Sequence, residues 1–250
     1  MIKTLSKNSK INNLDNDFTI NQVRDFWNEV IDMYESSNEQ FEDTHLQRFQ
    51  ESIKHLNLKP GQKILNIWSR TGLAIPYLRQ KCRNIEIYNL EVADKFIEIA
   101  RKKYPNETFQ ETDLKNLPFE NNYFDHILSL ETLEHAPSPL IFLKELHRTL
   151  KPNGLLVMSL PPATSELPLK VYELFFSNHG EGPHKFLSSK KVKKLLNLAD
   201  LKIILHKGTL LIPVGPKILK KFGEKIINKL QNTPISELGI RQFYICKKIK

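Results

Sequence analysis

Acidic side chains follow two of the strands that the sequence predicts. Glu91 comes directly after "IEIYNL", 19 residues beyond Gly72, and Asp113 follows a short strand near Thr108–Gln110. Ligands of open α/β sheets lie across the carboxyl ends of the strands, where such carboxylates can accept hydrogen bonds from hydroxyl or amino groups. Simpler interpretations remain open, with Glu91 as a solvated loop residue and Asp113 as the cap of the turn "LKNL".

The stretch 64–72, "ILNIWSRTG", precedes these carboxylates at a strand-to-helix corner. A nucleotide-binding turn uses glycine where the backbone approaches its ligand closely or adopts a left-handed conformation. Here Gly72 is the only glycine. The stretch therefore predicts a cofactor turn, the remains of one, or an ordinary corner.

Strand and helix signals alternate from Lys63 onward. Such alternation predicts βαβ units and a Rossmann-like, doubly wound α/β sheet with helices on both faces. We expect one domain over 20–250, which begins with helices within 20–58 and follows a polar, flexible stretch at 1–19. Two insertions are predicted: a lid-like connection at 162–187 and a basic helix within 208–235.

Four segments together resemble a class I S-adenosylmethionine-dependent methyltransferase of the small-molecule type that acts in quinone biosynthesis and glycan tailoring. They are "ILNIWSRTG", "IYNLEVADKFIEIARKK", the block from "ETDLKNLPF" to "LKPNGLLVMSLP", and "HKFLSSKKVKKLLNLADLKI". The resemblance covers roughly 40–247. It implies a sheet of seven strands with the last strand antiparallel, and S-adenosylmethionine as the cofactor.

The resemblance also implies roles for particular residues. Glu91 would accept both ribose hydroxyls, and Asp113 with the adjacent Leu114 would hold the adenine amino group. Leu130 lies where the cofactor and acceptor pockets meet. His135, in "LETLEHAP", is the candidate general base for an oxygen acceptor, although it could instead hydrogen-bond the backbone at a helix entry.

The family's first turn usually reads acidic–x–Gly–x–Gly–x–Gly, and this chain departs from it. Asn66 takes the acidic position, Trp68 and Arg70 take the first two glycines, and Gly72 keeps the third. S-adenosylmethionine carries a net charge of +1, so a unit charge ~7 Å away changes its binding by roughly 2.4 kcal/mol. Arg70 could escape that penalty by pointing into solvent, or could pair with the cofactor's carboxylate.

Three functions follow from this altered turn. The first is a working methyltransferase with a small-molecule, glycan or lipid-linked acceptor, methylated at oxygen. The second is a catalytically inactive methyltransferase-fold protein that serves as a binding or regulatory partner. The third is a changed ligand, such as an anion held by Arg70 and the following helix.

Composition limits the kinds of partner and the cellular compartment that we expect. The 250 residues include 37 Lys and Arg against 28 Asp and Glu, a net charge of +9 that favours an anionic partner or reflects solvated basic faces. Two cysteines without paired spacing, and the spacing of His179 and His184, predict no metal site. We expect a cytoplasmic protein that does not bind nucleic acid. The predicted basic helix either packs on the core or touches a membrane surface.

Overall fold

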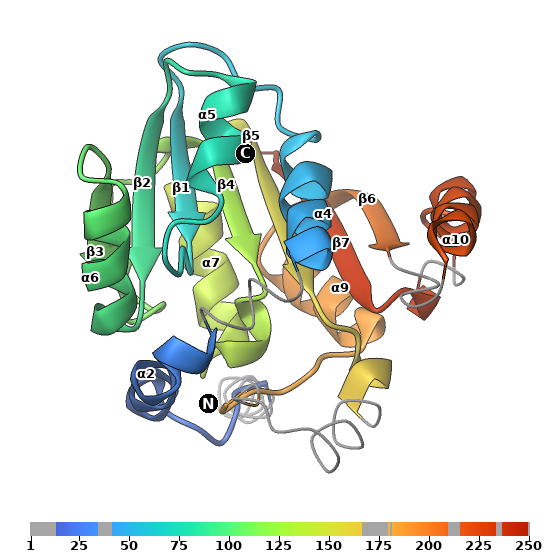
Figure 1. The fold of residues 1–250 in the computed structure, drawn as a ribbon, viewed down its shortest axis with the longest axis horizontal. Coiled ribbons are helices and arrows are strands. Elements are labelled where there is room, and N and C mark those ends of the chain that lie inside the picture. Colours follow the sequence, from blue (N-terminus) through green and yellow to red (C-terminus); the bar gives the residue numbers. More distant parts are fainter. Residues whose placement is uncertain are drawn as a thin grey trace, which may run out of the picture.

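The computed structural model describes residues 14–34, 42–166, 180, 182–209, 216–233 and 237–249. Its centre is a seven-stranded sheet in the order β3-β2-β1-β4-β5-β7-β6 (Figure 1). β7 pairs antiparallel with both β5 and β6, and the other pairings are parallel. The predicted fold class is confirmed, including the antiparallel last strand. The strands are β1 (Lys63–Ile67), β2 (Glu86–Glu91), β3 (Thr108–Glu111), β4 (Phe124–Leu130), β5 (Leu150–Leu160), β6 (Leu201–Thr209) and β7 (Arg241–Lys248).

Two apolar cores lie on opposite faces of the sheet. Helices α4, α5 and α6 contribute to one core, and α7 and α9 contribute to the other, together with α2 (Figure 1). Central strands are buried on both faces, as in most parallel sheets, so most of their residues are apolar. The helices are α2 (Ile20–Glu29), α4 (Glu42–Ile53), α5 (Ile75–Lys81), α6 (Asp94–Lys103), α7 (Pro139–Thr149), α9 (Ser189–Leu198) and α10 (Lys217–Lys229).

Helix α2 lies across the end of the sheet at which the parallel strands finish (Figure 1). A capping box between Thr19 and Gln22 begins the helix, and Val23 and Trp27 are buried beneath it. The segment before it was expected to be flexible. Its described part is instead packed, because Leu14 is buried and the Asn16 side chain donates to the carbonyl of Ala136. Residues 1–13 lie outside the described residues.

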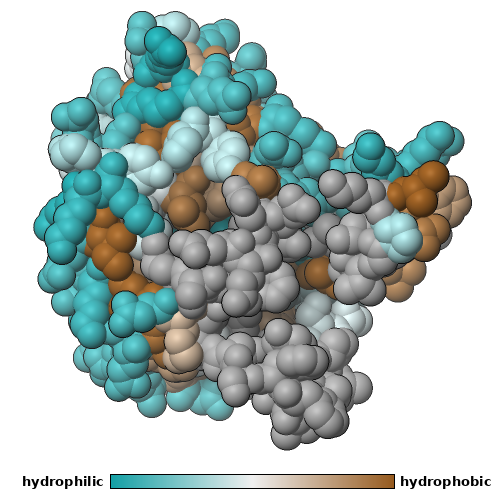
Figure 2. Space-filling model, in the orientation of Figure 1, coloured by the Kyte–Doolittle hydropathy of each residue, from teal (hydrophilic) through white to brown (hydrophobic). Residues whose placement is uncertain are grey.

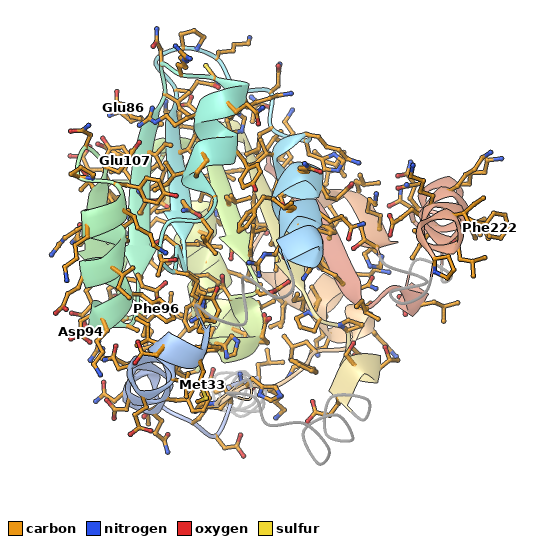
Figure 3. The ribbon with its side chains drawn as sticks, viewed as in Figure 1. Met33, Glu86, Asp94, Phe96, Glu107 and Phe222 are labelled. Carbon is orange, nitrogen blue, oxygen red and sulfur yellow. The ribbon has the colours of Figure 1, made fainter. Side chains whose placement is uncertain are left out.

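Helix α10 departs from the expectation of a fully core-packed apolar face. Ile227 is buried, but Ile218, Leu219 and Phe222 are 75%, 48% and 57% exposed. Figure 2 shows a hydrophobic patch over this helix, and Figure 3 shows Phe222 pointing away from the body of the protein. Within the described residues, no helix is long and apolar enough to cross a membrane.

Candidate functional site

Left-handed backbone gathers at the carboxyl ends of the strands. Among the described residues, eight other than glycine have a positive φ, and four of these are Asn or Asp, which tolerate that conformation. The other four are Trp68, Arg70, Leu114 and Glu131, with φ of 62°, 51°, 63° and 52°. All four lie in segments that follow β1, β3 or β4. Each costs roughly 1–2 kcal/mol, and strained residues of this kind cluster at functional sites.

The first turn keeps the backbone shape of a glycine-rich turn without its glycines. Trp68, Arg70 and Gly72 are all left-handed, at the alternate positions where the family has glycine. At Gly72, with φ of 82°, an added Cβ would lie 2.9 Å from the Tyr104 ring. The left-handed turn therefore carries a Trp and an Arg side chain at two positions where the family pattern has glycine.

The side chain of Arg70 packs inside an aromatic cluster. Its guanidinium carbon lies 3.8 Å from the Trp27 ring centroid, 4.5 Å from Trp68, 5.3 Å from Phe96 and 5.4 Å from Tyr34. Only 9% of Arg70 is exposed, so this cation is largely removed from water. The expectation that Arg70 points into solvent is therefore wrong, and its pairing with a cofactor carboxylate stays a prediction.

Glu91 binds the same turn through its carboxylate. One oxygen accepts from the backbone N–H of Arg70 at 2.6 Å, and the other accepts from Val92 and Ala93 at 2.8 and 3.2 Å. The side chain is fully buried. Burial raises the pKa of the Glu91 carboxyl, and the Arg70 charge and the three backbone bonds oppose that rise. Glu91 is thus not a solvated loop residue.

Asp113 caps a turn, as its simpler interpretation expected. Its carboxylate accepts from the backbone N–H groups of Lys115 and Asn116 at 2.8 and 2.9 Å. Burial works to raise the pKa of Asp113, but the hydrogen bonds from Asn116 and Lys115 and the Lys115 charge together outweigh it, and the pKa lies below its usual range. Leu114 and Leu130 are both buried. Asn66 lies within β1, and its amide donates to the Asn89 side chain at 2.8 Å.

His135 is enclosed on the other side of Trp68. The two rings stack with centroids 5.2 Å apart, and Nδ1 donates to the carbonyl of Pro183 at 3.0 Å. The bond to a carbonyl fixes the neutral tautomer, with the ring lone pair on Nε2. Burial lowers the pKa of His135 to about 3, and the neighbouring Arg70 charge adds to the effect. Its role as general base stays a prediction, which requires that Trp68 uncover the ring.

Sequence reasoning missed three residues that complete this end of the sheet. Trp27 was predicted only as part of an apolar stripe. Arg48 and Arg241 both bind the Glu131 carboxylate, yet they lie on α4 and β7, almost 200 residues apart. No local spacing could have indicated either contact. Most of the predicted lid falls on residues 167–179 and 181, which lie outside the described residues. His179 is among them.

A cavity of about 660 Å³ lies elsewhere, at the edge where β6 begins. It contains none of the residues discussed above. Its lining is His147, Lys193, Asn197, Asp200, Leu201, Lys202, Ile203 and Ile249. Within the described part of the chain, no three His, Cys, Asp or Glu side chains gather as metal ligands.

Comparison with known proteins identifies the domain. Residues 65–158 match the family model described as a methyltransferase domain. Within these residues the chain carries a methyltransferase domain. A demethylmenaquinone methyltransferase of Staphylococcus saprophyticus is 28% identical over 169 residues, which cover 65% of this chain and 72% of that protein. A second, from Thermotoga maritima, is 32% identical over 116 residues, covering 46% of this chain and 51% of its own length.

Solved structures agree with the fold. A methyltransferase from Thermotoga maritima that depends on S-adenosylmethionine superposes with a TM-score of 0.67 at 20% identity, covering 91% of this chain and 99% of its own. Another such methyltransferase, from Aquifex aeolicus, superposes with a TM-score of 0.58 at 17% identity, covering 85% of this chain and 97% of its own. The domain match and these neighbours imply S-adenosylmethionine as the cofactor.

The arrangement described here does not accommodate that cofactor. Three backbone N–H groups occupy the Glu91 carboxylate, which has no surface for ribose hydroxyls. The guanidinium of Arg70 and the ring of Trp68 project from the turn that a cofactor would approach. The first turn is therefore closed, and it has to open before a cofactor can enter.

Proposed function

We propose that the protein is an S-adenosylmethionine-dependent methyltransferase that methylates a small aromatic acceptor of the quinone type. The observation that carries the proposal is the group of four left-handed residues other than Asn and Asp at the carboxyl ends of the strands. Strain of this kind persists where a binding site requires it. A decayed turn without a ligand would have no reason to keep Trp68 and Arg70 in a costly backbone conformation.

The acceptor class is supported by the relatives whose names state demethylmenaquinone as their substrate. Because the aligned regions span about half to 72% of those proteins, the acceptor belongs to the proposal rather than to the match. Methylation at oxygen is the prediction made from the sequence. Ring carbon is the alternative, and the product distinguishes the two.

Binding of the cofactor is the first test. S-adenosylmethionine at ~100 times its dissociation constant should stabilise the fold by ~2.7 kcal/mol, measured as a raised melting temperature. Glu91→Ala should weaken binding by roughly 1–3 kcal/mol in calorimetry, because the carboxylate that fixes the first turn through three backbone N–H groups is lost. Glu98→Ala, at an exposed position on α6, is the matched control and should bind as the wild type does.

Transfer is the second test. Demethylmenaquinone with a shortened side chain should take up labelled methyl groups from the cofactor, and nuclear magnetic resonance of the product assigns the methylated atom.

A second function has its own support, because the closed turn and the enclosed Glu91 carboxylate suit a methyltransferase-fold protein without catalysis. If the wild type shows no calorimetric heat and no shift in melting temperature at millimolar cofactor, that second function is favoured.

A further inference from the structure

The aromatic cluster around Arg70 has the form of a cation-binding box. Four rings surround one guanidinium: Trp27 and Tyr34 from the N-terminal helical region, Trp68 from the first turn and Phe96 from α6. A cation within about 6 Å of an aromatic ring face is attracted by its electrons, and more strongly when water is excluded. Because only 9% of Arg70 is exposed to solvent, the box already holds one desolvated cation.

The box is closed by α2, which is attached by polar contacts to the residue after β2 and to α6. Arg24 donates to the carbonyl of Val92 at 3.1 Å, and Lys95 donates to the carbonyl of Asn28 at 3.0 Å. From the other side, the backbone of Gly182 lies against the ring of Phe26, where an added Cβ would come within 2.3 Å. Figure 3 shows Phe96 at the same end of the sheet as α2. A ligand that enters here has to displace both Arg70 and α2.

A buried donor also belongs to one ring of the box. Trp68 is 4% exposed, and its indole Nε1 has no hydrogen-bond partner among the described residues. Buried donors of this kind are rare in folded proteins, and each costs roughly 1–3 kcal/mol. The left-handed turn beneath it already has the backbone shape of a cofactor turn.

We propose that Arg70 is an internal plug: its guanidinium occupies the aromatic box in place of a ligand cation and holds α2 closed over the first turn. Cofactor binding then requires Arg70 to leave, so that α2 opens as the cofactor enters. The competition with S-adenosylmethionine rests on the proposed function. The closure of α2 by Arg70 does not depend on it.

The closure is tested without any ligand. Arg70→Gly suits the left-handed backbone at this position and is expected to fold. Hydrogen exchange in residues 20–34 should accelerate in Arg70→Gly, remain slow in Arg70→Lys, and be unaffected by Arg83→Gly, an exposed arginine beyond α5. Trp27 and Trp68 are the only two tryptophans of the chain and both contact Arg70, so intrinsic fluorescence should change in the same variant. Unchanged exchange in α2 would overturn the proposal.

The competition is tested with two ligands that differ in one charge. S-adenosylmethionine carries a sulfonium, whereas S-adenosylhomocysteine has a neutral sulfur. Arg70→Gly should bind S-adenosylmethionine roughly tenfold to a hundredfold more tightly than the wild type, and should gain less for S-adenosylhomocysteine. Equal or weaker binding of S-adenosylmethionine by Arg70→Gly would overturn the competition. If no variant binds either ligand while exchange in α2 still accelerates, the proposed function fails and the closure by Arg70 is supported.

Discussion

At the scale of single residues, Asn66 shows why an altered motif can be locally consistent. Its amide donates to Asn89 Oδ1 at 2.8 Å, and the Asn89 amide in turn donates to the carbonyl of Thr108 at 3.1 Å. An aspartate at 66 would place an acceptor against Oδ1. If Asn89 turned its amide toward the new acid, its oxygen would then face the Thr108 carbonyl. One of the two buried hydrogen bonds is lost in either case.

We therefore expect Asn66→Asp to lower the free energy of unfolding by about 1–3 kcal/mol, because a buried acceptor is left unpaired. Urea denaturation measures the change. Asn84→Asp, at an exposed position before β2, is the matched control and should be close to neutral. Equal stabilities of the two variants would contradict the amide argument. Restoring the family's acid at 66 is thus a poor test of cofactor binding, and a change at Arg70 alone is the informative one.

At the scale of elements, the helices and strands could largely be predicted from the sequence. Short, mostly apolar segments such as 124–130 indicate buried strands, and the stripe that contains Val23 and Trp27 indicates a helix with one buried face. Periodicity gives the buried face but not the partner that covers it. The contact between Trp27 and Arg70 depends on where α2 crosses the sheet, so no local pattern could predict it.

Helix α10 shows the same limit from the opposite direction. Its apolar residues have helical spacing, which predicted either packing on the core or contact with a membrane surface. Ile218, Leu219 and Phe222 are exposed, and the nearby Lys221 and Lys225 are exposed as well. Apolar side chains flanked by lysines are typical of helices that lie in a membrane interface.

We predict that the protein sediments with vesicles containing anionic lipid at low salt. Each lysine near such a surface contributes about 1 kcal/mol, so Lys221→Glu with Lys225→Glu should weaken binding at least about thirtyfold. The melting temperature should hardly change, since both positions are exposed. Lys102→Glu with Lys103→Glu, on α6, is the charge-matched control. A wild type that stays in the supernatant, or a control that loses binding equally, would rule out α10 as the contact.

At the scale of the whole molecule, buried histidines make the stability of the fold depend on pH. Burial lowers the pKa of His135 to about 3, and burial also lowers the pKa values of His126 and His206. The unfolded chain takes up protons on these side chains near pH 6.5, while the folded protein does not. Their contribution to stability is complete above that pH and is lost as the pH falls toward the folded values. Glu91 acts in the opposite sense, because its raised pKa lets the folded state bind a proton that the unfolded state has released.

The last prediction follows from that difference in protonation. Between pH 6.5 and 5, His135 alone should make the free energy of unfolding fall by about 1.7 kcal/mol in all, with a slope that steepens toward about 1.4 kcal/mol per pH unit. His135→Leu removes the titrating ring, so its stability should depend less steeply on pH by this amount, whatever its stability at pH 7. Urea denaturation at pH 7, 6 and 5 measures both slopes. Parallel slopes would mean that His135 is accessible to protons in the folded protein, which would also restore it as a candidate base near neutral pH.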